Sequence, residues 1–371
     1  MKILYIGYHR EGSDWGTLTK NNILALDAAG LDVACRSVAL EGAAPLIGKI
    51  NQLERKPIDG CDVCVQHVFP NSLVGSTKFK KNIAILSNSF VDLTHTTTIE
   101  YLKQVDEVWV SNEDHKKNIE NDLNVRVVPN PCDTEKFKQR YQDIQIPQGA
   151  GKFKFYSFLN SSDMTSIDTV FSCFHAEFDY SDRVTLVVVV SDPSEQSRDK
   201  MNHASSEIKS GLGLNKDNAN YIKEVIITDN SLSEEHLLAA HQYGNCFLEF
   251  SNTPWPNHAV NAMGLGSKVI LINSGGGKDL LTNFPDCGHA VGYSLKCDKT
   301  LGGFLDLGLG KDFTCVPDQR DVRKAMRSEY EKWLTNPVSF EKSTKTNGVL
   351  ACDLLSLKNV GSKMKEMLSN D

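Results

Sequence analysis

The chain consists of short apolar segments that alternate with longer, more polar segments from one end of the sequence to the other. The short segments have the length of strands and are apolar throughout, as parallel strands covered on both faces must be. The predicted strands are residues 2–6, 32–36, 62–67, 83–86, 107–110, 125–128, 154–159, 185–190, 225–228, 247–250 and 269–272. Strands that alternate with helices favour parallel, doubly wound sheets and therefore an α/β fold.

Helices are predicted where polar starts and glycine stops bound the segments between the strands. They are residues 16–29, 113–121, 166–174, 195–208, 233–241, 257–265, 321–334 and 350–368. A polar segment with Pro and Gly, residues 142–153, lies between the sixth and seventh strands and is typical of a linker. A chain of 371 residues is long enough for two domains. The sequence therefore predicts two α/β domains of the same architecture.

The bulk composition limits the class of protein. Forty basic and 47 acidic residues give a net charge of −7, which argues against a dominant surface for nucleic-acid phosphates. No segment approaches ~18 consecutive apolar residues, and the N-terminal apolar run has only the length of a strand, so neither a membrane span nor a signal peptide is expected. The ten cysteines lie mostly in apolar segments, and we expect reduced core thiols in a cytoplasmic protein.

The segment from Phe247 to Lys278 carries the most informative functional pattern. It contains a strand, a loop rich in Pro and Asn, a helix, a second strand and three consecutive glycines that begin at Gly275. A loop that leads into a helix presents unpaired backbone N–H groups and a positive dipole end, and both suit a diphosphate. Because ligands of open α/β sheets bind beyond the carboxyl ends of the strands, this segment is predicted to line a ligand site.

The same segment resembles the donor-sugar site of the family 4 retaining glycosyltransferases. Those enzymes have the GT-B fold, in which two Rossmann-like domains with parallel sheets face a central cleft. Their pattern is a Glu, seven residues, a second Glu, then Ala-Met-x-x-Gly, a Val-Ile strand and a Gly-Gly turn. The motifs NAMGLGSKVI and SGGG keep this frame, but Asn261 stands at the second Glu and Thr253, eight residues upstream, at the first. The resemblance implies a preserved fold with an altered donor site.

A second motif of the resemblance is the segment that joins the two domains. After the strand of DEVWVSN, the chain matches the family's Val-Pro-Asn-x-x-Asp-x-x-x-Phe hinge at Val128, Pro129, Asn130, Asp133 and Phe137. The resemblance implies an N-terminal acceptor domain at residues 1–140 and a C-terminal nucleotide-sugar donor domain at 141–338. A C-terminal helix within 339–371 is expected to cross back to the first domain. On its residues alone, Pro-Asn-Pro is also ordinary turn chemistry.

The resemblance indicates which residues of the second domain and of the first loop would bind the donor. The family has an Arg and, further on, a Lys after the first strand of this domain; here Asn160 and Ser161 offer hydrogen bonds without charge, and Met164 or Thr165 falls about where the Lys would be. The other predicted donor-binding residues are Gly16, Thr228, Asp229, Trp255, Asn257, His258, Asn261, Gly275, Gly276 and Lys278. Arg10 and Lys278 are the cations that could replace the missing pair. Trp255 can pack on the core as readily as on a sugar ring.

Candidate acceptor-binding and catalytic residues lie at strand ends of the first half. His9 and Arg10 follow the first strand and are predicted to contact the acceptor. His67 ends a strand, and Asn88 and His95 follow the next one; these three are the candidate catalytic residues, although a histidine at a strand end is often structural. In the family, the leaving phosphate is pictured as the base of the retaining reaction. The resemblance therefore implies no metal and no cofactor beyond the nucleotide sugar.

These features predict a cytoplasmic, metal-independent, retaining glycosyltransferase (a hexosyl- or pentosyltransferase) that uses a nucleotide-diphosphate sugar. Its acceptor is a glycan, a small molecule or a modified DNA base. One alternative is a DNA-modifying glycosyltransferase acting on hydroxymethylated pyrimidine bases. It would need a basic face, and the densest lysines of the first domain are Lys78, Lys80, Lys81, Lys116 and Lys117. The other alternative is a non-catalytic GT-B scaffold or partner subunit, favoured by the replaced acids and the replaced Arg/Lys pair.

Overall fold

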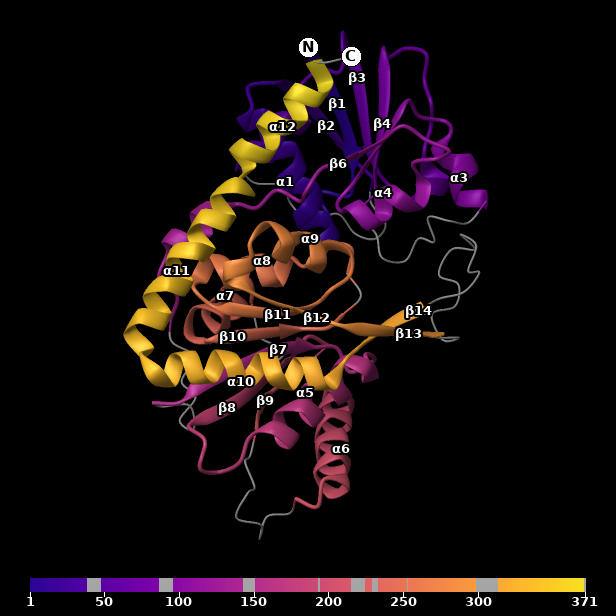
Figure 1. Ribbon diagram of the computed structural model, residues 1–371. Helices are drawn as coiled ribbons and strands as arrows, with labels where there is room; N and C mark the ends of the chain where they lie inside the picture. The colour runs from indigo at the N-terminus through magenta and orange to yellow at the C-terminus, as the bar shows by residue number, and fades with distance from the viewer. Residues whose placement is uncertain are drawn as a thin grey trace.

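The computed structural model describes residues 1–38, 48–86, 96–142, 151–192, 194–214, 224–228, 233–251, 253–297 and 313–369. Figure 1 shows two α/β domains, one above the other, with the C-terminal helices running along one side of both. Each domain contains a six-stranded sheet. The predicted fold class, two α/β domains with parallel sheets, is confirmed.

The sheet of the first domain is parallel throughout, in the order β2-β1-β3-β4-β5-β6. Its strands are β1 (Lys2–Gly7), β2 (Asp32–Ser37), β3 (Val63–His67), β4 (Lys81–Leu86), β5 (Glu107–Val110) and β6 (Val125–Val127). The helices are α1 (Asp14–Ala28), α2 (Gly48–Glu54), α3 (Thr96–Leu102), α4 (Glu113–Ile119) and the 3₁₀ turns η1 (Pro70–Ser72) and η2 (Thr134–Lys138). The strand order reverses between β1 and β3, and such a reversal is where open α/β sheets bind ligands.

The sheet of the second domain is also parallel, in the order β12-β11-β10-β7-β8-β9. Its strands are β7 (Phe153–Leu159), β8 (Val184–Val190), β9 (Val225–Ile227), β10 (Cys246–Glu249), β11 (Lys268–Ile272) and β12 (Gly288–Val291). The helices are α5 (Met164–Glu177), α6 (Glu195–Gly211), α7 (Glu234–Tyr243), α8 (Asn257–Leu265), α9 (Gly275–Asn283), η4 (Pro285–Cys287) and α10 (Gln319–Thr335). An antiparallel pair, β13 (Tyr293–Cys297) and β14 (Phe313–Pro317), stands apart. The order is that of a dinucleotide-binding fold, with its reversal between β7 and β10.

The C-terminal segment differs from the prediction of one helix at residues 350–368. It forms two helices, α11 (Pro337–Leu354) and α12 (Leu357–Ser369). The break has a tertiary cause: the Cys132 N–H donates to the Leu355 carbonyl (2.8 Å), and the Leu357 N–H donates to the Cys132 carbonyl (3.2 Å). Cys132 belongs to the segment that leaves the first domain, so the two chain crossings between the domains lie side by side. We call these backbone contacts of Cys132 with Leu355 and Leu357 the hinge.

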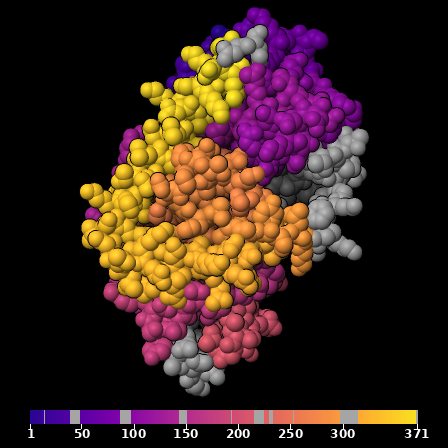
Figure 2. Space-filling view, in the orientation of Figure 1, coloured from indigo at the N-terminus to yellow at the C-terminus, as the bar shows by residue number. Residues whose placement is uncertain are grey.

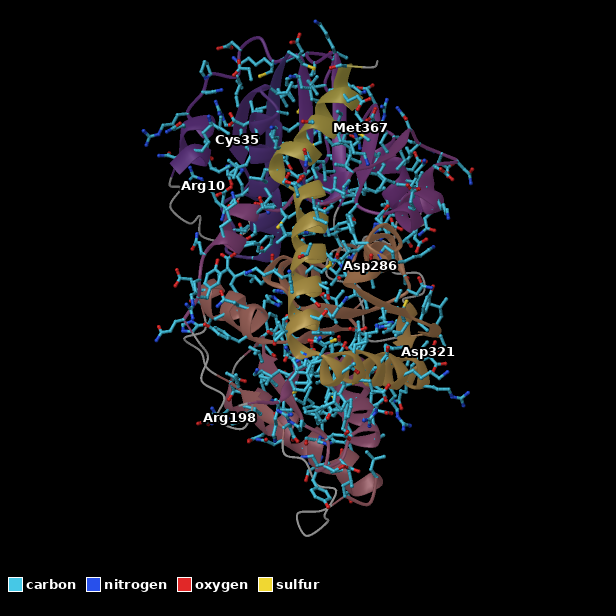
Figure 3. The ribbon with its side chains drawn as sticks, turned by 60° about the vertical axis from the view of Figure 1, so that its left-hand side comes forward. Arg10, Cys35, Arg198, Asp286, Asp321 and Met367 are labelled. Carbon is cyan, nitrogen blue, oxygen red and sulfur yellow. The ribbon has the colours of Figure 1, made fainter. Side chains whose placement is uncertain are left out.

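Each side of the hinge is anchored to a domain by close helix packing. On α12, a Cβ at Gly361 would lie 1.9 Å from the Ala25 carbonyl oxygen of α1, so the two helices touch at a glycine. On α11, a Cβ at Gly348 would lie 1.8 Å from the Met263 carbonyl oxygen of α8. Figures 2 and 3 show these C-terminal helices as one continuous band over both domains. Within the described residues 337–369, the C-terminal segment therefore divides between the domains at the hinge, because α11 packs on α8 of the second domain and α12 on α1 of the first.

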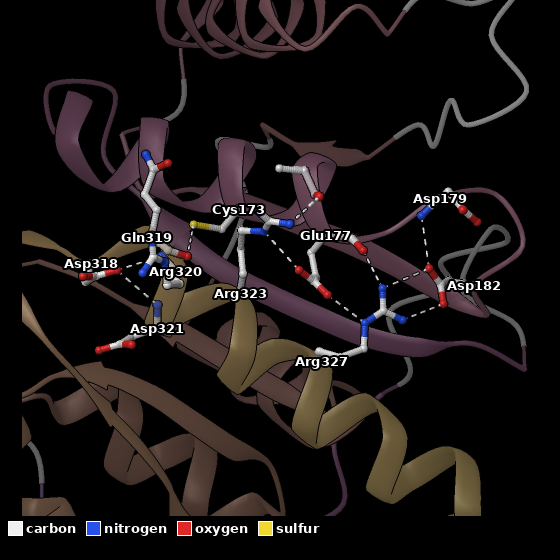
Figure 4. A network of polar contacts seen from close by, with 11 residues as sticks. Cys173, Glu177, Asp179, Asp182, Asp318, Gln319, Arg320, Asp321, Arg323 and Arg327 are labelled. Carbon is white, nitrogen blue, oxygen red and sulfur yellow. Dashed lines mark hydrogen bonds and ion pairs between the residues drawn. The ribbon is translucent and has the colours of Figure 1, made fainter.

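Charged contacts fix α10 to the second domain (Figure 4). Glu177, at the end of α5, accepts from Arg323 Nε (3.0 Å) and from Arg327 Nε (2.8 Å). Arg327 Nη1 also pairs with Asp182 at 2.9 Å. This network holds α10, the helix that leads into α11, on the second domain. In the described parts of the chain, no helix combines the length and the apolar character that a membrane crossing requires.

Candidate functional site

At the reversal point of the first sheet, His67 lies beside Gly7, the last residue of β1. The His67 Nδ1 is 3.0 Å from the Tyr5 hydroxyl and 3.3 Å from the Thr19 hydroxyl. Burial lowers the pKa of His67 to about 4, so its ring is uncharged and a weak base at neutral pH. A catalytic base is most effective with a pKa near the working pH. The surroundings of His67 are those of a structural histidine, and its catalytic role stays a prediction.

The loop after β1 carries the two predicted acceptor contacts, and both bind Glu54 of α2. His9 Nε2 lies 3.2 Å from Glu54 Oε1, and Arg10 donates to both carboxylate oxygens. Burial lowers the pKa of His9, and the Glu54 hydrogen bond opposes that shift. In the first turn of α1, a Cβ at Gly16 would lie 2.0 Å from the Glu11 carbonyl oxygen of this loop. Gly16 therefore allows the loop to approach the start of α1 closely, and the charge of Arg10 is balanced within the first domain.

At the reversal point of the second sheet, the loop after β7 is held by its own hydrogen bonds. The Ser161 N–H and hydroxyl donate to Asp192, at 2.8 and 2.5 Å, and Asn160 Oδ1 accepts from the N–H and hydroxyl of Ser162. Partial burial alone would raise the pKa of Asp192, but the bonds from Ser161 and one from Ser197 lower it. The predicted donor contacts Asn160 and Ser161 thus lie at the expected strand end, with their polar groups bonded within the second domain.

Thr228 follows β9 and is bound by a cation that the sequence interpretation missed. Arg198, in the first turn of α6, donates from Nε to the Thr228 hydroxyl (2.6 Å) and from Nη2 to the Thr228 carbonyl (3.3 Å). Arg198 is labelled in Figure 3, on the second domain. An Arg just after a helix start is a weak signal by itself, because nothing in the sequence places it beside β9. The predicted residues Asn88, His95 and Asp229 lie outside the described residues.

The loop between β10 and α8 is packed on the protein itself. Trp255 is 7% exposed and belongs to the apolar cluster beneath α8 and α9. The His258 ring packs edge-on against Phe158, with centroids 5.1 Å apart. Asn257, His258 and Asn261 are partly exposed along α8, which spans the predicted residues. A Cβ at Gly264 would lie 2.5 Å from the Phe137 ring, so two motifs of the sequence resemblance touch each other.

The three glycines, interpreted from the sequence as a turn, form the first turn of α9, and Gly275 contacts the first domain. Gly275 has a φ of 51°, and its N–H donates to Asp114 Oδ2 at 2.9 Å. Lys278 Nζ lies 3.0 Å from Asp114 Oδ1, and this carboxylate raises the pKa of Lys278. A Cβ at Gly276 would lie 2.4 Å from the Pro254 carbonyl oxygen, so that glycine packs on the loop before α8. Two predicted phosphate-binding groups, Gly275 and Lys278, are thus bound by a carboxylate of the other domain.

Strand ends of the two domains meet at this contact. Asn112 Nδ2, directly after β5, donates to the Pro254 carbonyl at 2.8 Å, and the Ser111 hydroxyl donates to the same oxygen at 3.3 Å. The Glu113 N–H donates to Asp279 Oδ2 at 2.7 Å. The sequence interpretation named none of these acids or amides as site residues, because each partner lies more than 140 positions away along the chain.

Other candidate groups add little charge to this region. Of the five lysines considered for a basic face, Lys80, Lys81 and Lys116 pair with Asp62, Glu107 and Glu120, respectively. These pairs reduce the positive charge of that face. Among the described residues, no three His, Cys, Asp or Glu side chains are grouped so as to hold a metal ion.

Known proteins resemble this chain in structure. No protein-family model and no curated protein matches it in sequence. The trehalose-6-phosphate synthase OtsA is similar with a TM-score of 0.64 and 10% identity, over 100% of this chain and 99% of that one. The N-terminal domain of Candida albicans trehalose-6-phosphate phosphatase is similar with a TM-score of 0.60 and 14% identity, over 100% and 97% of the two chains. Anabaena HepE, solved with UDP-glucose, has a TM-score of 0.57 and 12% identity over 100% of both chains.

The chain has the GT-B fold. At these identities the likeness concerns the fold alone, and it does not distinguish family 4 from other GT-B proteins.

Proposed function

We propose that this protein is a cytoplasmic glycosyltransferase that moves a hexosyl or pentosyl group from a nucleotide-diphosphate sugar to a glycan or small-molecule acceptor. The observation that supports this most is that loops at the carboxyl ends of strands from both sheets meet, at Asn112 of the first domain and Pro254 of the second. In the second sheet, the contacting loop follows β10, which borders the reversal point, and ligands of open α/β sheets bind at such points. The similar structure of HepE, solved with UDP-glucose, points to the same class of donor.

The proposed reaction is retaining and needs no metal. The bond between the sugar C1 and the diphosphate oxygen breaks, and the acceptor oxygen bonds to C1 on the same face. The acceptor proton passes to the released phosphate oxygen, so no protein carboxylate has to act as nucleophile. The Asn261 amide can both donate to and accept from a ribose hydroxyl, where a carboxylate only accepts.

The chain's own groups for the leaving diphosphate are Gly275, Lys278 and Arg10. Each is bound to a carboxylate, Asp114 or Glu54, which presents the same kind of anionic oxygen as a phosphate. A donor that reached these groups would replace the carboxylate rather than fill an empty site. Such an exchange lowers the net gain from binding, and we expect modest affinity for the donor.

Turnover of a panel of uridine, guanosine and adenosine diphosphate sugars tests the proposal. Release of the nucleoside diphosphate with at least one of them is expected, and Asn261→Ala should raise the KM for that donor by about tenfold, as one lost hydrogen bond of about 1.4 kcal/mol would. Asn202→Ala, an exposed amide on α6, is the matched control. Absence of both turnover and thermal stabilisation with every nucleotide would refute the proposal.

A non-catalytic scaffold or partner subunit is the second candidate, favoured by the internal pairing of Lys278 and Arg10. The fold alone does not decide, since it also forms the N-terminal domain of a protein named as a phosphatase. A scaffold predicts no turnover and no thermal shift in the panel above. Addition of duplex DNA to the same assay tests the DNA-modifying alternative, which predicts a shift that weakens steeply with salt.

A further inference from the structure

Two helices from different domains cap each other. The N-terminus of α9 in the second domain is capped by Asp114, which lies in the first turn of α4. The N-terminus of α4 in the first domain is capped by Asp279, which lies in α9, through the bond from the Glu113 N–H. The first N–H groups of a helix have no partner within the helix, so each cap satisfies a donor that would otherwise need water. Here each partner comes from the opposite domain.

Electrostatics adds to both caps. A carboxylate at a helix N-terminus is stabilised by the helix dipole, and Lys278 adds a full positive charge beside Asp114. The pKa of Asp114 is lowered by the Gly275 N–H and by Lys278, although partial burial opposes that shift. Burial raises the pKa of Asp279, and the Glu113 N–H opposes that shift. Asp114 therefore has a cationic partner in addition to the helix N–H that it caps.

These caps lie on a part of the domain boundary that is built differently from the hinge. At the hinge, the Cys132 backbone is bonded to Leu355 and Leu357, and helices pack at glycines. At the caps, the contacts are side chain to backbone or side chain to side chain, and the Asp114 and Lys278 side chains are 32% and 38% exposed. Contacts of that kind re-form with water at little cost when the two surfaces separate.

We propose that Asp114 and Asp279 form a latch that holds the two domains together without a ligand and releases when they open about the hinge. The latch consists of these two carboxylates with Gly275, Lys278 and the Glu113 N–H. It sets how often the strand-end loops of both domains become accessible. The inference goes beyond the proposed function and does not depend on it, because opening can be measured without any substrate.

Amide hydrogen exchange at the two capped helix starts tests the latch. In Asp114→Ala the Gly275 amide loses its acceptor directly, and we expect its protection to fall about fivefold, as the loss of one cap of about 1 kcal/mol would produce. The decisive result is at the other helix: the protection of the Glu113 amide, which still faces Asp279, should also fall about fivefold. In Asp279→Ala the Glu113 amide loses its acceptor directly, and we expect the protection of both the Glu113 and the Gly275 amides to fall about fivefold.

Controls separate a latch from local fraying of one helix. Glu113→Ala removes another first-turn acid of α4 but keeps both caps, and Asp286→Ala removes an exposed acid just after α9; neither should change the protection of the Gly275 amide. Lys278→Met weakens the hold on Asp114 from the second domain and should deprotect the Glu113 amide of the first. Solution X-ray scattering should show a larger radius of gyration for the Asp114→Ala, Asp279→Ala double variant. Loss confined to the amide whose own cap was removed, or unchanged dimensions of the double variant, would overturn the proposal.

Discussion

Two lysine–carboxylate pairs of this protein have the same chemistry and different surroundings. Lys209 of α6 and Glu224 lie within the second domain, with their charged atoms 2.5 Å apart and side chains 9% and 7% exposed. Lys278 and Asp114 lie between the domains, 3.0 Å apart and about one third exposed, at 38% and 32%. The first pair is enclosed by helices of one domain, and the second is open to solvent at a domain boundary.

The surroundings of each pair determine what it can contribute. A buried pair is costly to separate, since one charge would remain in the protein interior without its partner. An exposed pair contributes little to stability, because water and salt replace the partner. The inner pair therefore keeps a domain folded, whereas the outer pair is suited to a contact that forms and breaks.

The largest expected effect comes from breaking the inner pair. Glu224→Ala leaves Lys209 and His175 buried without the carboxylate that both contact, and we expect a loss of about 3–5 kcal/mol in the free energy of unfolding. Urea unfolding followed by circular dichroism measures it. Glu207→Ala on α6, the helix of Lys209, removes an exposed acid that pairs with His203 and should change stability by less than about 0.5 kcal/mol. Equal losses of stability in the two variants would show that burial does not decide how much such a pair contributes.

Acid should remove the contribution of the inner pair in a defined range. Burial alone would raise the pKa of Glu224, but hydrogen bonds from His175, Lys209 and Ser205 lower it from 4.5 to about 2. Between these two values the unfolded chain binds more protons, so stability present above pH 4.5 is lost as the pH falls towards 2. We expect this contribution to be about 3 kcal/mol. The stability difference between the wild type and Glu224→Gln, measured from pH 7 to 2.5, should shrink below pH 4.5; a constant difference contradicts the assignment.

Breaking the outer pair should barely affect folding. Asp114→Ala removes one exposed ion pair and one helix cap, and we expect at most about 1 kcal/mol in the unfolding free energy. The same urea titration applies. A loss as large as that of Glu224→Ala would mean that the domains cannot exist apart, and that Asp114 supports the fold itself.

Salt should produce the smallest of these effects, and it should act on the exposed pair but not on the buried one. At 1 M salt the Debye length is about 3 Å, so the exposed Lys278–Asp114 pair is screened and the buried pair is not. We expect the protection of the Gly275 amide to fall by about twofold between 0.1 and 1 M NaCl. Amides of α6 near Lys209 serve as the reference, and their protection should not change. A fall of the same size in α6 would show that salt acts on the whole protein.

Much of the fold was predictable from local pattern. Buried parallel strands are apolar throughout, and helix α8 was predicted with its observed bounds because Gly266 ends it in the left-handed conformation. The break between α11 and α12 was not predictable, because it depends on Cys132, more than 200 positions earlier. The first turn of α9 was also misread, since three glycines indicate a turn unless neighbouring elements supply the caps and packing that favour a helix.

The site was less predictable than the fold, for a physical reason. Strand ends could be located from the strand pattern, which brought His9 and His67 into consideration, and the family resemblance added Ser161. Their partners could not be located, because Glu54 and Asp192 reach them only through tertiary packing. Sequence pattern identifies which groups could bind an anion, and the fold decides that Asp114 already binds Gly275 and Lys278.

We expect a nucleotide sugar to bind at the domain boundary in competition with Asp114. Calorimetric titration of UDP-glucose into the wild type and into Asp114→Ala measures this competition. Binding should be saturable and about fivefold tighter in the variant, because a larger fraction of its molecules is open. Equal affinities would contradict the competition, and no binding heat with either protein for any nucleotide sugar would contradict the assigned function.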